Sequence, residues 1–350
     1  MPEPTPQHVS ESSSASGTGH VLVFDVGGSH ISAAICEQHT YNLRGLSRAP
    51  LPADGAGHFS AASFGRLVHT LGEAAANAAG LDLDQVSGAG LAMPGPFDYD
   101  RGISQMRHKL PSLFGVDLKT ALSARFAWQP EQVRFVNDAA AFLLGEVGAG
   151  AAKGFSRSIG ITLGTGIGCA YSVNGRIAVP SDQPGGDPGV PPGGEIWNLP
   201  YNGATVEDFV STRFLRQQYL TLTGLEAEVS DVAAIALCRE HQPCPPLEAT
   251  LAHQPVASTR VATGISPSKA ARQAFQEFGR HLGLALNQHA ARFSPEVIVL
   301  GGGISRAANL FLPATRKALA GFSPKISIST LMDEAPLAGA GVHWFMPPAV

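Results

Sequence analysis

The chain has 350 residues, more than one ordinary hydrophobic core accommodates, so two lobes are expected. With 44% hydrophobic residues, 15% charged residues and a formal net charge of −4, the composition gives no sign of a nucleic-acid or membrane partner, and no apolar run reaches the roughly 18 residues of a membrane span. The 40 glycines favour an α/β protein with many tight turns over a helical bundle.

Residues 1–20 are rich in Pro, Ser, Thr and Gly, and they contain no apolar segment of the kind found in a secretory signal. They predict a disordered tail on a cytoplasmic protein. The four cysteines, Cys36, Cys169, Cys238 and Cys244, form no C-x-x-C pair. Their spacing indicates reduced thiols rather than a zinc site.

The first half of the chain predicts a sheet that begins directly after this tail. An apolar run at 21–24 ends in an acidic residue and two glycines, and 31–35 resumes it, which indicates a strand, a tight turn and an antiparallel return. A third strand is expected near Leu46. Residues 59–79 carry apolar side chains at helical spacing, and 88–95 contain a short strand that a proline ends.

The second half repeats the scheme of strands that end in glycine-rich turns. Strands are expected at 131–136, 158–163, 297–300 and 326–330, with a hairpin that turns at Asn174 and Gly175. Helical spacing is found at 139–150, 206–222, 268–292, 307–320 and 338–344. An ordered Pro/Gly-rich loop is expected at 181–194, and 242–267 is compatible with a helix or with loops.

Three turns, each after an apolar strand, combine glycines with hydroxyl groups or with further glycines: Gly27, Gly28 and Ser29; Gly164, Thr165 and Gly166; and Gly301, Gly302 and Gly303. Backbone N–H groups in such turns can point at a phosphate chain, and a flat glycine turn can lie against a planar base. Each turn alone is also explained as a plain hairpin or strand-to-helix turn. The set of three favours a nucleotide site, and the P-loop and dinucleotide-binding motifs are absent from the sequence.

Two acidic residues at strand ends have chemical roles in this interpretation. Asp25 is expected to hold a magnesium ion through water. Asp138, which follows Asn137 at the end of a strand, is expected to accept the proton of a hydroxyl group during its phosphorylation. Taken alone, Asp138 is better explained as a helix cap, but beside the glycine turns the catalytic interpretation is favoured.

Two further loops suit a sugar pocket. Glu195, which follows two glycines, can accept hydrogen bonds from two sugar hydroxyls, or it is a surface acid. Gly95 lies in a rigid Pro/Gly segment that can form a wall of the pocket, or the segment is a plain turn.

Five segments resemble the ROK family of sugar kinases, a branch of the sugar kinase/actin/Hsp70 superfamily. They occur in the family's order between about Val21 and Trp344, as FDVGGSHISAAI, AMPGPFD, VNDAAAFLLGE, ITLGTGIG and VIVLGGGIS. The resemblance implies a two-lobed α/β fold of the actin/hexokinase-like (ribonuclease H-like) type with an interlobe cleft. We expect 21–137 with 335–350 to form a small N-terminal lobe, and 138–334 to form a large C-terminal lobe.

The resemblance also implies an enzyme, a sugar kinase that transfers phosphate from ATP with Mg²⁺ to a hexose or hexose derivative, at its 6-hydroxyl. Asp138 would be the general base. By the same resemblance the first glycine turn lies near the transferred phosphate, the second is another phosphate loop and the third contacts adenosine. Homodimerisation is expected by analogy.

The sugar contacts are also carried over from the resemblance. Asn137 and Glu195 match sugar-binding residues of the family, and His108 lies where family members place a further sugar contact. Where the family continues from Gly-Glu into Gly-His, this chain has Trp197 and Asn198, so Asn198 takes the place of the histidine.

The same loop lacks the cysteines with which many family members bind zinc, so we expect no structural zinc. These departures leave three alternatives open: a sugar-binding sensor without activity, a kinase for an N-acetylated amino sugar, and a kinase that uses polyphosphate. The family's repressors carry an N-terminal helix-turn-helix, for which residues 1–20 are too few, so no nucleic-acid partner is expected.

Overall fold

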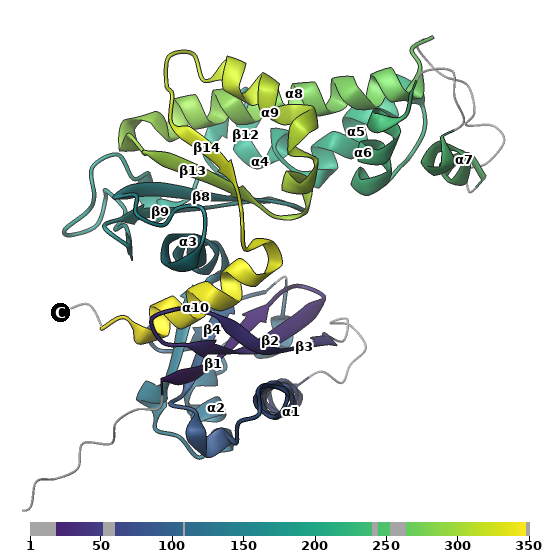
Figure 1. Cartoon of the computed structure of the whole chain (residues 1–350). Helices are drawn as coiled ribbons and strands as arrows, with labels where there is room; N and C mark the ends of the chain where they lie inside the picture. The colour runs from purple at the N-terminus through teal and green to yellow at the C-terminus, as the bar shows by residue number, and fades with distance from the viewer. Residues whose placement is uncertain (1–18, 52–59, 108, 240–243, 253–263, 348–350) are drawn as a thin grey trace, which may run out of the picture.

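The computed structural model describes residues 19–51, 60–107, 109–239, 244–252 and 264–347. Two five-stranded sheets lie one above the other, with two helices between them and further helices on their outer faces (Figure 1). The mixed α/β architecture predicted from the sequence is therefore confirmed.

The first sheet has the spatial strand order β3 (Leu43–Pro50), β2 (His30–Glu37), β1 (His20–Val26), β4 (Ala89–Met93) and β7 (Val133–Asn137). The strand pairs β1–β2 and β2–β3 are antiparallel, whereas β1, β4 and β7 run parallel to one another. The helices α1 (Ala61–Ala79) and α2 (Leu118–Phe126) cover its outer face. The parallel strands carry nearly continuous apolar runs because both of their faces are buried.

Local signals at its ends account for α1. The Ser60 hydroxyl accepts a hydrogen bond from the backbone N–H of Ser63, and Gly80 ends the helix in the left-handed region at φ 74°. Phe64 and Val68 lie on the stripe that packs against the sheet, and both are fully buried. Burial of each such side chain stabilises the fold by about 1.5–3 kcal/mol.

The second sheet repeats the arrangement of the first, in the order β10 (Arg176–Ile177), β9 (Ile167–Val173), β8 (Arg157–Leu163), β13 (Val297–Gly301) and β14 (Lys325–Ile328). Its strands β8, β13 and β14 are parallel, and β9 is antiparallel to β8. Its outer face packs against helices that include α4 (Val206–Phe209), α5 (Thr212–Thr223), α6 (Val229–Leu237), α8 (Pro267–His289) and α9 (Ala308–Ala318).

The smaller elements connect these layers. They are the two-stranded pairs β5 (Phe97–Asp98) with β6 (Ile103–Ser104) and β11 (Pro200–Tyr201) with β12 (Ala204–Thr205), the helix α7 (Pro245–Ala252), and the 3₁₀ turns Leu83–Gln85, Pro111–Leu113, Pro130–Gln132, Pro192–Gly194, Ala291–Phe293, Gly303–Ala307 and Met332–Glu334.

The helices α3 (Asp138–Ala149) and α10 (Ala335–Phe345) form the layer between the sheets, and α3 packs against the second sheet while α10 packs against the first. Glycines let the two helices meet at their backbones. A Cβ atom added to Gly339 would lie 1.7 Å from the carbonyl oxygen of Ala141, and one added to Gly145 would lie 2.1 Å from that of Ala335. The two halves of the molecule therefore meet across a crossing that only glycine permits.

Most predicted strands and helices are confirmed to within a few residues, but 206–222 is not one helix. It divides into α4 and α5 at Val210 and Ser211, because the Ser211 hydroxyl accepts from the N–H of Phe214 and starts a second helix. The helices α2 and α6 were not predicted. Of the ambiguous segment 242–267, α7 is helical, and 253–263 lie outside the described residues, as do residues 1–18 of the predicted tail.

The interpretation of the cysteines as reduced thiols is wrong for one pair, because Cys238 and Cys244 form a disulfide between the end of α6 and the start of α7. Six positions separate them, a spacing that sequence alone does not distinguish from two free thiols. Cys36 and Cys169 are free and buried.

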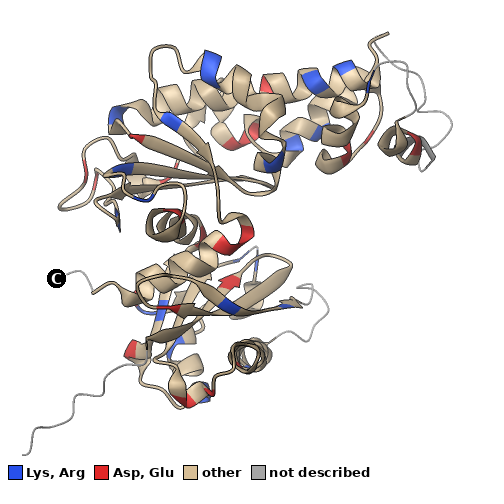
Figure 2. Cartoon of the chain, in the orientation of Figure 1, with Lys and Arg blue, Asp and Glu red and all other residues tan. Residues whose placement is uncertain are grey.

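Charged side chains of both signs are scattered over many elements of the described chain (Figure 2). Within the same ranges, no helix combines the length and apolar character needed to cross a membrane. The described residues also contain no group of three or more His, Cys, Asp or Glu side chains that could hold a metal ion.

Candidate active site

The carboxyl ends of three parallel strands place several predicted residues at one edge of the first sheet. Asp25 pairs in register with Ala92, and Met93 pairs with Asn137. Gly95 follows β4 by two residues, and Asp138 follows β7 directly. Because parallel strands end at a common edge, the topology alone gathers these residues into one site.

The first glycine turn is open to solvent beyond β1. The N–H of Gly27 donates to the carbonyl of His30 at 2.9 Å and closes the turn. Gly28 and Ser29 are exposed, and a Cβ atom on Gly28 would meet nothing within 4 Å. The space that a side chain would occupy there is available to a ligand.

Asp25 and Asp138 lie close enough to interact electrostatically. Burial, and then the charge of Asp138, raise the pKa of Asp25 to about 7, although Arg48 acts in the opposite direction. Burial also raises the pKa of Asp138, while Lys109 and the N–H of Ala139, which donates to its Oδ1 at 2.8 Å, act to lower it.

The cap of α3 is Asn137 and not Asp138. The Asn137 Oδ1 atom accepts from the N–H of Ala140 at 3.0 Å, and its Nδ2 atom donates to the Tyr99 hydroxyl at 3.1 Å. The capping explanation that competed for Asp138 therefore applies to its neighbour. Asp138 is the first residue of the helix, where the helix dipole favours its ionised form.

Tyr99, Lys109 and Glu195 complete a cluster around Asp138. Burial raises the pKa of Glu195; a hydrogen bond to Trp197 and the charge of Lys109 lower it, and the charge of Asp138 raises it. Burial also raises the pKa of Tyr99, and the charges of Asp138 and Glu195 add to this increase. Acidic, basic and phenolic groups thus share one partly buried space.

Two members of this cluster were missed from the sequence. Tyr99 lies just beyond the Gly95 segment, and a Cβ atom on Gly95 would lie 3.4 Å from its hydroxyl. Lys109 is adjacent to His108, which lies outside the described residues. Asn198 is exposed and, within the described chain, makes no side-chain hydrogen bond, so the geometry does not bring it into the cluster.

We expect Tyr99→Phe to raise the KM for the sugar acceptor that the sequence predicts by about fivefold, while kcat changes little. The loss of one hydrogen bond, worth about 1 kcal/mol, would release the amide of Asn137 from its fixed orientation. Steady-state kinetics against Tyr41→Phe, a hydroxyl deletion outside the cluster, measures this effect. Equal KM values in the two variants would contradict it.

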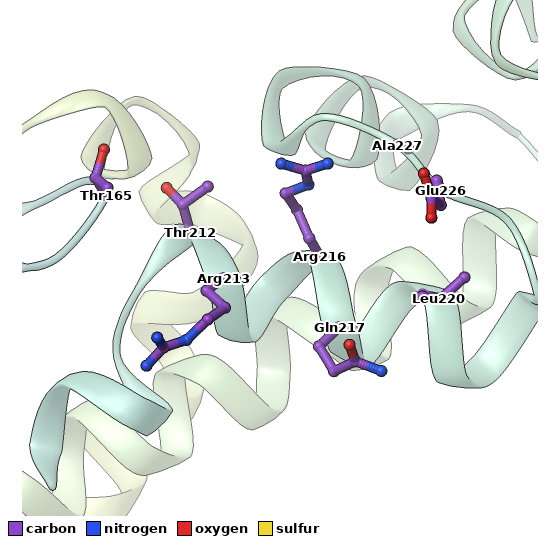
Figure 3. A pocket seen from close by; sticks show the side chains of 8 residues that line it. All are labelled: Thr165, Thr212, Arg213, Arg216, Gln217, Leu220, Glu226 and Ala227. Atoms are coloured by element: carbon purple, nitrogen blue, oxygen red, sulfur yellow. The ribbon is translucent and has the colours of Figure 1, made fainter. Parts of the chain in front are cut away.

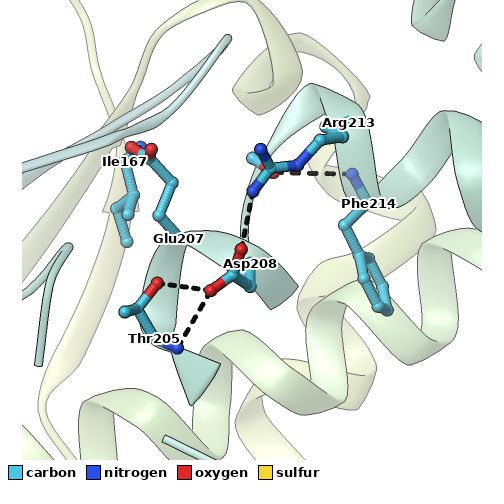
Figure 4. Close-up of polar contacts among 7 residues, drawn as sticks. Ile167, Thr205, Glu207, Asp208, Arg213 and Phe214 are labelled. Carbon is cyan, nitrogen blue, oxygen red and sulfur yellow. Dashed lines mark hydrogen bonds and ion pairs between the residues drawn. The ribbon is translucent and has the colours of Figure 1, made fainter. Parts of the chain in front are cut away.

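The second glycine turn lies between β8 and β9 and is held by the junction of α4 and α5. The carbonyl of Gly164 accepts from both the N–H and the hydroxyl of Thr212, each at 2.9 Å. The N–H of Ile167 donates to a carboxylate oxygen of Glu207 at 3.3 Å (Figure 4). Asp208, next to Glu207, accepts from Thr205 and pairs with Arg213 at 2.7 Å, which fixes the junction (Figure 4).

The third glycine turn adjoins the second at the edge of the second sheet. Gly302 has φ 79°, and a Cβ atom there would lie 2.4 Å from the carbonyl oxygen of Leu163, at the end of β8. Glycine is therefore required at this position. Nothing lies within 4 Å of a Cβ atom built on Gly164 or Gly303, so both turns leave space beside them.

Contacts across the central layer connect the turns to Asp138. A Cβ atom on Gly168, after the second turn, would lie 3.1 Å from that of Ala139. Arg306, after the third turn, forms a 2.9 Å ion pair with Asp333, whose charge also acts on Asp25. All three turns thus lie around the two acids at the facing ends of the sheets.

A cavity of about 350 Å³ opens beside the second turn (Figure 3). Thr165 lines one end, and the other lining residues come from α5 and the segment before α6: Thr212, Arg213, Arg216, Gln217, Leu220, Glu226 and Ala227. The sequence predicted helical structure at 206–222 but gave no sign that this helix borders the glycine turn.

Comparison with known proteins assigns the chain to a family. A model of the ROK family matches residues 21–342. The chain belongs to the ROK family. A glucokinase of Thermotoga maritima is 27% identical over 336 residues, which covers 90% of this chain and 94% of the relative.

Solved structures of ROK proteins share the fold. The ROK hexokinase of Thermus thermophilus aligns with a TM-score of 0.65 at 24% identity over 92% of this chain and 97% of its own. A ROK glucokinase of Streptomyces griseus, in complex with glucose and AMPPNP, aligns with a TM-score of 0.61 at 20% identity over 92% and 98%. The two-lobed actin/hexokinase-like fold predicted from the sequence is confirmed.

Proposed function

We propose that this ROK protein is a kinase that transfers the γ-phosphoryl group of ATP to the 6-hydroxyl of a hexose or hexose derivative, with Asp138 as general base. One observation carries the proposal: three glycine turns, far apart in sequence, lie around Asp25 and Asp138 at the facing ends of two sheets. The glucokinase relatives support the same reaction class.

The acceptor would bind between two lobes, 21–137 with 335–350 and 138–334. Asn137 and Glu195 would hold sugar hydroxyls, since the amide of Asn137 is oriented by Tyr99 and the carboxylate of Glu195 lies close enough to Asp138 to share its electrostatic surroundings. The wall near Gly95 and the contact expected of His108 complete this part of the proposal, whereas the exposed Asn198 has no part in it.

The nucleotide would extend from the cavity beside Thr165 to the first glycine turn. The cavity combines Leu220 and Ala227 with polar side chains, which suits a nucleoside with its apolar ring and polar edges. The turn Gly301–Gly303 would contact the adenosine, the phosphates would pass Gly164, Thr165 and Gly166, and the γ-phosphate would lie against Gly27, Gly28 and Ser29. The open space beside Gly28 leaves room for it.

Asp25 fits a magnesium ion held through water. Burial and the neighbouring carboxylate of Asp138 both raise the pKa of Asp25. A divalent cation bound there would offset both effects. When bound, the ion would neutralise charge on the phosphate oxygens.

In the proposed reaction Asp138 accepts the proton of the sugar hydroxyl as that oxygen forms a bond to the γ-phosphorus. The bond from the γ-phosphorus to the bridging oxygen of ADP breaks in line, and ADP leaves with its electron pair. Backbone N–H groups of the glycine turns would stabilise the spreading negative charge, and closure of the lobes would exclude water.

A coupled ADP-release assay with ATP and Mg²⁺ against a panel of hexoses, amino sugars and N-acetylated amino sugars tests this function. A hexose that accelerates ADP release supports it. Sugar-dependent thermal stabilisation without ADP release would instead indicate a sensor. If sugar phosphate forms only with polyphosphate, then polyphosphate and not ATP is the phosphate donor. A preference for an N-acetylated sugar would identify an N-acetylated amino sugar as the acceptor.

The nucleotide assignment predicts the effect of Leu220→Trp. The indole would fill part of the cavity, and we expect the KM for ATP to rise about tenfold or more while the Kd for the sugar stays within twofold. Leu237→Trp, at an exposed position of α6, is the matched control. An unchanged KM for ATP in Leu220→Trp would remove the nucleotide from this cavity.

The family analogy further leads us to propose a homodimer, and we also propose the cytoplasmic location that was expected from the sequence. Light scattering of the full chain at micromolar concentration would give the mass of two chains, and the mass of one chain would exclude this assembly.

A further inference from the structure

Glu146 is a fully buried acid on α3 that the proposed reaction does not use. It lies eight residues after Asp138 on the same helix, on the side of the second sheet where the chain returns from β14. Its Oε2 atom accepts from the N–H of Ala151 at 2.7 Å. A buried carboxylate is costly unless its oxygens are hydrogen-bonded, so further donors are expected around it.

Those partners come from the segment that joins β14 to α10. The Ser329 hydroxyl donates to Glu146 Oε1 at 2.5 Å, and the N–H of Leu331 donates to the same atom at 3.2 Å. The Ser329 oxygen in turn accepts from the N–H of Met332 at 2.7 Å. One carboxylate therefore organises the whole bend before α10.

This bend is the second of two places where the chain passes between the sheets. The first pass is α3 itself, which follows β7 of the first sheet and leads to β8 of the second, and the second is 329–334. Glu146 lies on α3, the first connection between the sheets, and accepts hydrogen bonds from the bend 329–334, the second connection.

The far end of the bend reaches the proposed phosphate site. Asp333 pairs with Arg306, after the third glycine turn. Its charge also contributes, after burial and Asp138, to the raised pKa of Asp25 beside the first turn. Movement of 329–334 would thus shift groups beside two of the turns relative to Asp138.

We propose that Glu146 is a positioning residue: it fastens the bend 329–334 to the helix that begins with Asp138, so that base and glycine turns keep one relative position. The catalytic consequence rests on the proposed function, whereas the fastening itself is a property of the ligand-free chain. Displacement of reacting groups by about 1 Å can cost about 10² in rate, so a loosened bend acts on kcat.

The test compares two buried serines in the full chain. Ser329→Ala removes the donor to Glu146, and Ser158→Ala removes a buried β8 hydroxyl that has no hydrogen-bond partner among the described residues. Ser329→Thr retains a hydroxyl and serves as the rescue variant. In ligand-free hydrogen exchange, we expect the amides of Ala151, Leu331 and Met332 to exchange about fivefold faster or more in Ser329→Ala only.

In kinetics, Ser329→Ala should lower kcat about tenfold with the Kd for the sugar within twofold, and Ser329→Thr should restore most of the rate. Equal amide exchange rates in Ser329→Ala and Ser158→Ala would show that Glu146 does not fasten the bend, whether or not any sugar is phosphorylated. Faster exchange with unchanged kcat would overturn the positioning role. If the unmodified chain phosphorylates no sugar, the proposed function fails, and the exchange result alone decides the fastening.

Discussion

Asp138→Asn should lower kcat by about 10² or more at saturating ATP and sugar. The amide cannot accept the hydroxyl proton, and a general base typically contributes at least this factor to the rate. The substitution is nearly isosteric. Its carbonyl oxygen can still accept from the N–H of Ala139, and Asn137 still caps α3, so the helix should remain intact.

The control for this variant is Asp182→Asn, which neutralises an exposed acid in the loop before Glu195. Calorimetric binding of AMPPNP and the circular dichroism spectrum should match the unmodified chain in both variants. A rate for Asp138→Asn within a few-fold of that of Asp182→Asn would remove Asp138 from the role of base, even if the protein is a kinase.

Gly339→Ala should destabilise the protein strongly, by about 3 kcal/mol, the upper end of the usual cost of overpacking. The added methyl group would lie 1.7 Å from the carbonyl oxygen of Ala141, so the backbones of α3 and α10 must separate. For large domains each kcal/mol lowers Tm by about 2–4 °C, so thermal unfolding should move down by about 6–12 °C.

Gly65→Ala is the matched control, since Gly65 is also a helical glycine but its added methyl group would make only ordinary contacts, 3.6 Å from the Arg125 side chain. Alanine in a helix interior favours folding by up to about 1 kcal/mol relative to glycine. Tm should therefore stay or rise in Gly65→Ala. Equal Tm values in the two variants would show that the helices tolerate separation.

The strand ends that carry the glycine turns could be predicted because an apolar strand followed by glycines occurs three times, although each turn alone has a plain structural explanation. Asp25 and Asp138 were found for the same reason, as the residues that follow apolar runs. The sequence offered Asp138 as the cap of α3, but the cap is Asn137, because both residue types are good caps and the answer depends on side-chain direction.

The remaining features depend on tertiary contacts that no local pattern specifies. The cavity beside Thr165 forms because the break at Ser211 directs Thr212 back to Gly164. Tyr99 enters the site through a hydrogen bond to a residue 38 positions away. Glu146 was not singled out within the predicted helix 139–150, because its partner Ser329 lies 183 residues further along the chain.

The position of α10 has a consequence for co-translational folding on the ribosome. The strands of the first sheet all precede α10 in the chain by about 200 residues or more, but the face that carries Val21, Val23 and Cys36 is covered by α10. The N-terminal half therefore cannot bury this apolar face until residues 335–345 have been synthesised. A nascent chain that stops before residue 335 would leave the face open to aggregation, although every β-strand of the fold is already present in it.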